Sequence, residues 1–197
     1  MRRLLLVVLL LATVGIGWWV GMRFRPYEFK GRVLQSPDPA PDFELSGPNG
    51  QRVRLSDFRG KIVLLFFGYA SCPDVCPTTM YDLARALELL PPEKAAQVQV
   101  IMISVDPERD TPERLNAFVR NFHPSFLGLT GTPEEIAQVA TQYGIFYQKE
   151  EGTEATGYLM THTATVTLVD REGYIKVVFP FGTKPEEFAS DIAYLLR

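Results

Sequence analysis

Hydrophobic positions along the chain fall into short continuous runs separated by stretches with helical spacing. The runs Lys61–Phe67 and Val98–Val105 are largely apolar, as expected of strands that are covered on both faces of a sheet. Between them, apolar residues recur at helical spacing from Pro77 until Pro91-Pro92 ends the pattern. This succession predicts two buried strands joined by a helix.

The rest of the chain continues the alternation of strands and helices. The other predicted elements are a hairpin over Phe43–Leu45 and Val53–Leu55, helices that begin at Thr111-Pro112 and at the capping box Thr132–Glu135, strands over Thr163–Asp170 and Tyr174–Phe179, and a last helix opened by a capping box of Thr183 and Glu186. Strands that alternate with helices and end in a hairpin plus a helix predict an α/β domain. We expect a mixed central sheet flanked by helices.

The N-terminal segment has a different pattern. Two arginines precede an uninterrupted run of apolar or small residues from Leu4 to Met22, long enough at about 1.5 Å per residue to cross a bilayer. We therefore predict one N-terminal transmembrane helix over residues 1–22. A cleaved signal peptide is the alternative, but the apolar run is longer than usual for one and no A-x-A-like site follows. Four prolines then predict a semi-rigid linker over residues 23–41, leading to a domain over residues 42–197.

The charge distribution limits the partners and the compartment. The net charge is −3, and the first 40 residues hold six Lys/Arg against two Asp/Glu, so the domain itself is more acidic than the whole chain. An acidic domain without a Lys/Arg cluster is a poor binder of nucleic acid, because phosphate contacts supply most of that affinity. The arginines at the N-terminus favour an N-inside anchor, which places the domain on the extracytoplasmic side, in a periplasm or an intermembrane space.

The chain contains only two cysteines and two histidines. Cys72 and Cys76 lie in a loop between a buried strand and the helix predicted from Pro77, where the helix dipole stabilises thiolate and lowers the thiol pKa. A structural disulfide is the alternative, although a bridge across so short a loop stabilises a fold little. The C-x-x-x-C spacing is wider than the C-x-x-C of a redox pair and leaves room for a soft ion such as Cu(I).

A metal held by two thiolates needs a third ligand, for which histidine is the natural type. His123 follows a helix among aromatic residues, and we interpret it as a structural loop residue. His162 lies just before the strand Thr163–Asp170; in a thioredoxin-like sheet that strand runs beside the cysteine strand, which places His162 within reach of the sulfurs. Asp106 and Asp110 also invite an interpretation as paired acid/base groups, but loop shaping and capping explain them more economically.

Several segments together resemble one known family. Phe67-Gly68-Tyr69, Cys72–Pro77, Ser104–Pro112, Leu129–Gly131 and Tyr158–His162 occur in the order found in the SCO/SenC family of copper proteins. The resemblance covers nearly all of residues 41–197. It implies a thioredoxin-like fold of the peroxiredoxin-like variant, with copper, as Cu(I) or Cu(II), bound by Cys72, Cys76 and His162.

The resemblance also implies a role: maturation of the dinuclear copper site (CuA) in cytochrome c oxidase subunit II. The alternative is a thiol–disulfide reductase in which Cys72 and Cys76, able to form a disulfide, keep the cysteines of subunit II reduced for another copper carrier. A thioredoxin-like reductant would then regenerate the pair. A peroxidase is disfavoured because Tyr69 occupies the position of the threonine that peroxiredoxins use to orient the peroxide.

The chain departs from the family pattern at two positions. Ala70 stands where members often have threonine, which predicts a minor change in the loop before the cysteines. Thr161 stands where members often have aspartate, immediately before His162. A missing carboxylate predicts weaker orientation of the imidazole, which affects the copper affinity but not the ligand set.

Overall fold

The computed structural model describes residues 26–34, 38–153 and 157–197, together with Leu11, Thr13, Gly15 and Trp18. Apart from those four residues, the predicted membrane helix over residues 1–22 lies outside the described residues. In the part of the chain that is described, no helix combines the length and the apolar character needed to cross a membrane.

The described elements form an α/β domain, as the sequence predicts. The strands are β1 (Arg32–Val33), β2 (Glu44–Ser46), β3 (Arg52–Arg54), β4 (Ile62–Gly68), β5 (Val98–Ser104), β6 (Leu127–Leu129), β7 (Tyr147–Glu151), β8 (Tyr158–His162), β9 (Val166–Val169) and β10 (Ile175–Phe179). The helices are α2 (Val75–Glu88), α3 (Pro92–Ala95), α4 (Pro112–Arg120), α5 (Pro133–Gln142) and α6 (Pro185–Leu195), with short 3-10 turns η1 (Pro48–Gly50) and η2 (Leu55–Phe58).

Six strands form the central sheet, in the order β1-β10-β9-β4-β5-β6. The strands β4, β5 and β6 are parallel, whereas β9 is antiparallel to β4 and β10 is antiparallel to β9. The sheet is therefore mixed, as predicted. Every residue of β4 is buried, which explains why its sequence is a continuous apolar run rather than an alternating one.

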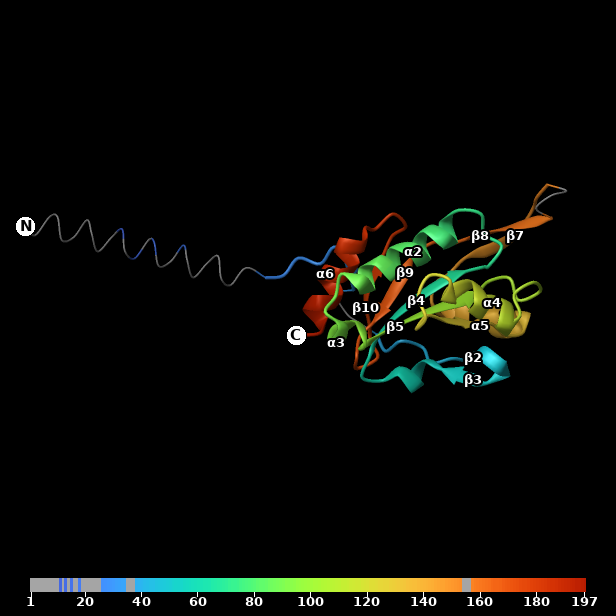
Figure 1. Cartoon of the computed structure of the whole chain (residues 1–197), viewed down its shortest axis with the longest axis horizontal. Coiled ribbons are helices and arrows are strands. Elements are labelled where there is room, and N and C mark those ends of the chain that lie inside the picture. The colour runs from blue at the N-terminus through green and yellow to red at the C-terminus, as the bar shows by residue number, and fades with distance from the viewer. Residues whose placement is uncertain are drawn as a thin grey trace, which may run out of the picture.

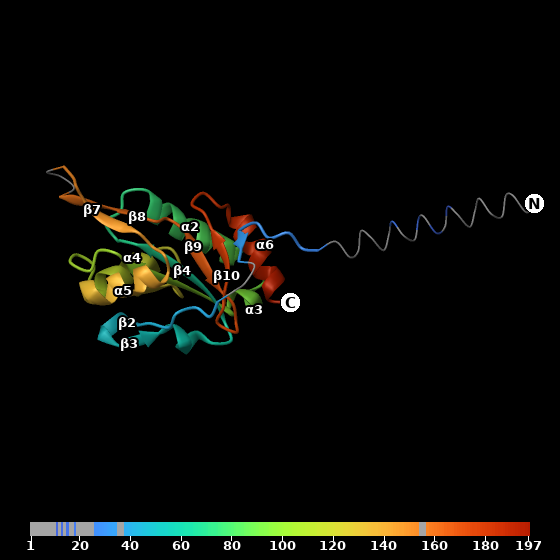
Figure 2. The same cartoon turned by 180° about the vertical axis from the view of Figure 1, so that it is seen from behind.

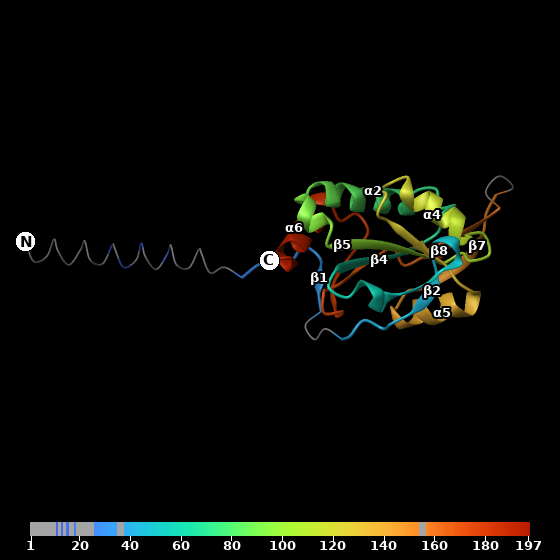
Figure 3. The same cartoon turned by 60° about the horizontal axis from the view of Figure 1, so that its bottom comes forward.

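Helices cover both faces of this sheet. The connections β4–α2–β5 and β5–α4–β6 join parallel neighbours, and right-handed crossovers place both helices on the same face. Helix α6 packs beside α2 on that face, while α5 and the β2–β3 hairpin lie against the other (Figure 3). The loop between β4 and α2 thus opens at the edge where the parallel strands end.

The strand that carries His162 differs from the prediction. His162 is expected in a loop just before a strand over Thr163–Asp170, but it is the last residue of β8, and β9 begins only at Val166. Strand β8 pairs with β7 in a separate two-stranded hairpin that projects from one end of the domain (Figure 1). The sequence does not predict this hairpin, because β7 is polar and mostly exposed. Strand β7 therefore lacks the alternating apolar pattern of a half-buried strand.

The start of α6 also differs from the prediction. The backbone N–H of Lys184 donates to the Glu187 carboxylate at 2.9 Å, whereas the Thr183 hydroxyl donates to the carbonyl of Pro180. The predicted capping box of Thr183 and Glu186 is therefore wrong. Pro185 occupies the first helical position, for which its fixed φ is suited, and this moves the helix start by one residue.

Part of the segment predicted as a linker packs on the domain. Strand β1 pairs with β10 at the edge of the central sheet. Beside it, the buried carboxylate of Asp191 on α6 accepts hydrogen bonds from the Tyr27 hydroxyl and from the backbone N–H groups of Lys30 and Gly31. Residues 26–34 lie next to α6, at the end of the domain opposite the β7–β8 hairpin (Figures 1 and 2).

Candidate metal centre

The two cysteines lie where the central strand passes into the first turn of a helix. Cys72 is in the loop after β4 and is half-buried, whereas Cys76 is the second residue of α2 and is fully buried. The backbone N–H of Cys76 donates to Cys72 Sγ at 3.4 Å. Helix α2 begins at Val75, two residues before the predicted start at Pro77, so the helix N-terminus points at the sulfur of Cys72.

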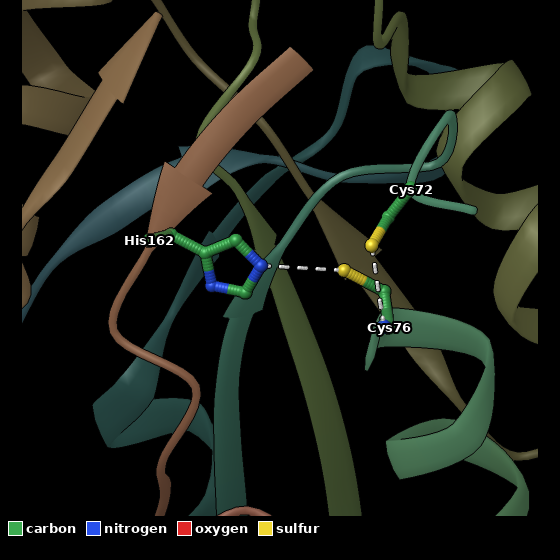
Figure 4. A group of neighbouring side chains, drawn as sticks. All are labelled: Cys72, Cys76 and His162. Atoms are coloured by element: carbon green, nitrogen blue, oxygen red, sulfur yellow. Dashed lines mark hydrogen bonds between the residues drawn. The ribbon is translucent and has the colours of Figure 1, made fainter. Parts of the chain in front are cut away.

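His162 reaches the same point from the opposite side. Its Nε2 lies 3.5 Å from Cys76 Sγ (Figure 4). The ligand atoms of Cys72, Cys76 and His162 all lie within 4.8 Å of one another, close enough to hold one metal ion. The structure therefore brings together the three residues that the sequence analysis selected, from the β4–α2 loop, from α2 and from β8.

The imidazole of His162 is oriented by the backbone and by aromatic rings. Its Nδ1 lies 3.2 Å from the carbonyl oxygen of Thr163, the geometry in which Nδ1–H donates and leaves Nε2 free to face the sulfurs. The rings of Phe66 and Tyr69 meet the imidazole edge-on, with centroids 5.9 and 6.0 Å away. Thr161, where the missing carboxylate predicts weaker orientation of the imidazole, is exposed. The carbonyl of Thr163 supplies the second hydrogen bond that such a carboxylate would provide.

The two thiols have opposite electrostatic environments. A hydrogen bond from the Cys76 thiol, joined by the backbone N–H donors near Asp74 and Cys76, holds the pKa of Cys72 well below its ordinary value. The same hydrogen bond to Cys72, together with burial, raises the pKa of Cys76. The metal-free reduced pair therefore carries one negative charge, located on the more exposed sulfur.

Gly68 leaves the space that Cys76 occupies. A Cβ at this last residue of β4 would lie 2.7 Å from Phe66, 2.9 Å from Cys76 Sγ and 3.0 Å from the methyl group of Met102. These distances are shorter than carbon and sulfur contacts allow, so the buried sulfur requires glycine here. The Gly that precedes Tyr69 in the sequence motif thus has a packing role.

Of the other residues considered, two aspartates support the site and one histidine is remote from it. Asp110 accepts from the Ala70 backbone N–H at 3.0 Å and from the Ser104 hydroxyl at 2.7 Å, which confirms the loop-shaping interpretation. Burial raises the pKa of the Asp110 carboxyl. Asp106 is also buried and belongs to the same loop. His123 makes a local contact with Ser125 through Nδ1, as expected of a structural loop histidine.

Comparison with known proteins assigns the chain to a family. The SCO1/SenC family profile matches residues 32–197. The chain belongs to the SCO1/SenC family. Among its relatives, protein SCO1 homolog 1, mitochondrial, of Arabidopsis thaliana is 40% identical over 130 residues, which make up 66% of this chain and 39% of the relative. The chain thus matches less than half of the length of that relative.

Solved structures agree with this assignment. Apo Sco1 from Thermus thermophilus is 46% identical, with a TM-score of 0.73 over 86% of this chain and 96% of that one. Arabidopsis thaliana ScoI with copper bound is 32% identical, with a TM-score of 0.76 over 81% and 99%. The mixed α/β domain of this SCO1/SenC protein is therefore the thioredoxin-like fold of the Sco structures.

Two residues of this SCO1/SenC protein that support the site lie in the family-like segments Ser104–Pro112 and Tyr158–His162, although the sequence assigned them no role. Arg109 and Tyr158 contact each other and Asp106, next to the start of β8. The contact joins positions 49 and 52 residues apart, so no local pattern marks it. Apart from the family-like segments, the signal was Asp106, an acidic residue just after a buried strand, at the end of the sheet where loops from neighbouring strands meet.

Proposed function

We propose that Cys72, Cys76 and His162 bind copper. The observation that carries this proposal is the convergence of two sulfurs and one imidazole nitrogen within 4.8 Å. Thiolates favour Cu(I), and an imidazole completes a three-ligand set of borderline softness that also accepts Cu(II). Structures of relatives from Arabidopsis thaliana and Bradyrhizobium japonicum with copper bound, 32% and 39% identical to this chain, support copper as the metal.

The charge of the pair suits reversible metal binding. Cys72 presents a thiolate to an incoming ion, and Cys76 releases its proton only when the ion takes the place of the hydrogen bond between the sulfurs. Copper held by few, partly exposed ligands can leave by stepwise exchange for thiolates of a recipient. This combination fits a carrier better than a permanent structural site.

The recipient that we propose is the dinuclear CuA site of cytochrome c oxidase subunit II. Cysteine thiolates of such a site would displace Cys72 first, because Cys72 is the more exposed ligand. The proposal includes the anchor over residues 1–22, which would hold the domain at the membrane on the extracytoplasmic side. A separate copper carrier would load the site.

A second candidate function uses the same sulfurs for thiol–disulfide exchange. The low pKa and partial exposure of Cys72 suit a nucleophile, and the buried Cys76 suits a resolving thiol. The Cys72 thiolate would attack a disulfide of subunit II, form a mixed disulfide and release one target thiolate. Cys76 would then attack Cys72, which yields a Cys72–Cys76 disulfide and a fully reduced target. A thioredoxin-like reductant would restore the dithiol.

Substitution of His162 separates the two functions. His162→Ala removes one ligand and leaves both sulfurs and the helix N-terminus in place. We expect the Cu(I) affinity to fall by at least the ~10–100-fold that follows loss of groups supporting a metal ligand. Oxidase assembly in cells at limiting copper should then fail, whereas disulfide exchange by the purified domain should continue.

The matched control is His123→Ala, which removes the other histidine of the chain and should leave copper binding unchanged. Cys72→Ser should abolish both activities in a folded protein. Normal oxidase activity in a strain that carries His162→Ala at limiting copper, with normal protein levels, would contradict copper delivery and favour the reductase.

A further inference from the structure

The ligand His162 lies on a hairpin that the central sheet does not position. Strand β8 pairs with β7, with Tyr147 opposite His162, and neither strand belongs to the six-stranded sheet. The hairpin extends beyond the end of that sheet (Figure 1). An isolated two-stranded hairpin is at best marginally stable in water, so its orientation depends on contacts with the rest of the domain.

One such contact is made at the first residue of β8. The Tyr158 hydroxyl donates to Asp106 Oδ1 at 2.6 Å, and Nη1 of Arg109 donates to the carbonyl oxygen of Tyr158 at 3.0 Å. The Arg109 guanidinium also stacks on the Tyr158 ring, 3.6 Å from its centroid, and its Nε donates to Asp106 Oδ2. The hydroxyl of Tyr158 is thus held by a buried acid, and its backbone carbonyl and ring are held by an arginine.

Asp106 and Tyr158 satisfy each other's hydrogen-bonding groups. Asp106 is 2% exposed, so its carboxylate is stabilised by its partners rather than by water. Burial and the hydrogen bond to Asp106 raise the pKa of the Tyr158 hydroxyl, which therefore remains a donor. Hydrogen bonds to a charged group are among the stronger ones in proteins.

The loop that holds β8 also holds the sulfur half of the site. Asp110, four residues after Asp106, accepts from the backbone N–H of Ala70, two residues before Cys72. Arg114, at the start of α4, donates to the hydroxyl of Ser71 at 2.6 Å and to the carbonyl of Arg109. The segment between β5 and α4 therefore touches both the cysteine loop and the strand that ends at His162.

We propose that Asp106, Arg109 and Tyr158 are positioning residues that hold β8 so that His162 faces the sulfur pair. They act through His162 and do not touch the metal. The inference rests on the proposed copper site, because it assigns a task to residues outside the ligand set. Without the cluster, the hairpin would still pair internally, but its last residue would no longer be fixed at the distance of Cys76.

Tyr158→Phe tests this role with the smallest change. Phenylalanine keeps the ring over Arg109 and removes the hydroxyl, which donates to buried Asp106 at 2.6 Å and, more weakly, to exposed Glu108 at 3.4 Å. Competition titration with a chromophoric Cu(I) chelator should show about 10-fold weaker binding than in the parent, as for other groups that orient metal ligands. The matched control is Tyr147→Phe, the same change on the other strand of the hairpin. In the described part of the chain, the Tyr147 hydroxyl is not among the donors to Asp106. This variant should bind Cu(I) like the parent.

A double-mutant cycle distinguishes positioning from general destabilisation. In a His162→Ala background, Tyr158→Phe should cause no further loss of affinity, because its effect passes through the missing imidazole. Equal losses in both backgrounds, or parent-like binding by Tyr158→Phe, would overturn the proposal. Within each background, Tyr158→Phe should leave the reaction of Cys72 with a thiol reagent unchanged.

A metal-free measurement keeps this test separate from the proposed function. In the reduced apo protein, the imidazole nitrogen resonances of His162 should shift or broaden in Tyr158→Phe and stay unchanged in Tyr147→Phe. If the parent fails to bind Cu(I), the copper proposal fails, and the resonances alone decide on the positioning role. Unchanged His162 resonances in Tyr158→Phe would reject it.

Discussion

The two cysteines, four positions apart, differ in what surrounds each sulfur. Cys72 receives hydrogen bonds from the thiol and the backbone N–H of Cys76, so several donors converge on the more exposed sulfur. Cys76 is enclosed by the core around Gly68, where no side chain fits. This asymmetry assigns the first contact with a metal or a disulfide to Cys72 and the second to Cys76, whichever of the two proposed chemistries operates.

The thiolate character of Cys72 should be visible in its pH dependence. Because the pKa of Cys72 is lowered, its thiolate persists as the pH falls below the ordinary thiol pKa of about 8.5. Alkylation of the reduced, metal-free protein by iodoacetamide should therefore keep nearly the same rate between about pH 8 and about pH 6, whereas an ordinary thiol slows about tenfold per unit. Peptide mapping after brief reaction should find the label on Cys72. A rate that falls tenfold per pH unit would show that the donors around Cys72 do not stabilise its thiolate.

At the scale of secondary structure, the sequence predicted the elements whose pattern follows from burial. Strands β4 and β5 are apolar throughout most of their length because helices cover both faces, and the boundaries agree within two residues. The cysteines were selected because they lie between a buried strand and a helix start, and His162 because it lies close to a neighbouring strand and matches the family pattern. The β7–β8 hairpin and the cluster of Asp106, Arg109 and Tyr158 were missed, since they depend on contacts between distant segments and leave no periodic signal.

The capping box of α5 offers a direct test at this scale. The Thr132 hydroxyl accepts from the Glu135 N–H at 3.2 Å, and the Glu135 carboxylate accepts from the Thr132 N–H at 2.8 Å, as the sequence predicted. Thr132→Ala should lower the free energy of unfolding by about 1 kcal/mol, the typical value of an N-cap. Urea denaturation measures it. Thr141→Ala is the matched control near the end of the same helix, where alanine is the better helix former and no loss is expected. Equal effects of the two substitutions would contradict the role of the box.

At the scale of the whole molecule, the metal centre and the entry of the chain lie at opposite ends. Residues 26–34 run beside α6, whereas the β4–α2 loop and β8 meet at the other end of the sheet (Figures 1 and 2). Tyr27 stacks on Tyr194 of α6 with ring centroids 4.0 Å apart, so this entry segment is fixed to the domain. With the proposed anchor in the membrane, such an arrangement would direct the copper site away from the lipid surface and towards a partner domain.

The entry segment should therefore contribute to the stability of the domain and leave copper binding unaffected. A fragment of residues 42–197 contains every ligand of the proposed site, and we still expect it to fold as a soluble monomer. It lacks β1, however, and the backbone of Gly31 lies directly against Val177 and Phe179, both of which are fully buried in the longer chain. Exposure of two such side chains costs about 1.5–3 kcal/mol each, and Asp191 also loses its three donors.

We expect the free energy of unfolding of a fragment of residues 26–197 to be at least about 3 kcal/mol larger than that of the fragment of residues 42–197. Urea denaturation of the two reduced fragments measures the difference. Their Cu(I) affinities should agree, because the segment that is removed lies at the far end of the sheet from Cys72, Cys76 and His162. Equal stabilities would mean that the entry segment is a spacer after all, with no part in the fold. If the shorter fragment lost copper affinity as well as stability, the entry segment and the metal centre would be coupled through the sheet. The packing of residues 26–34 on α6 would then affect the copper affinity of the proposed site.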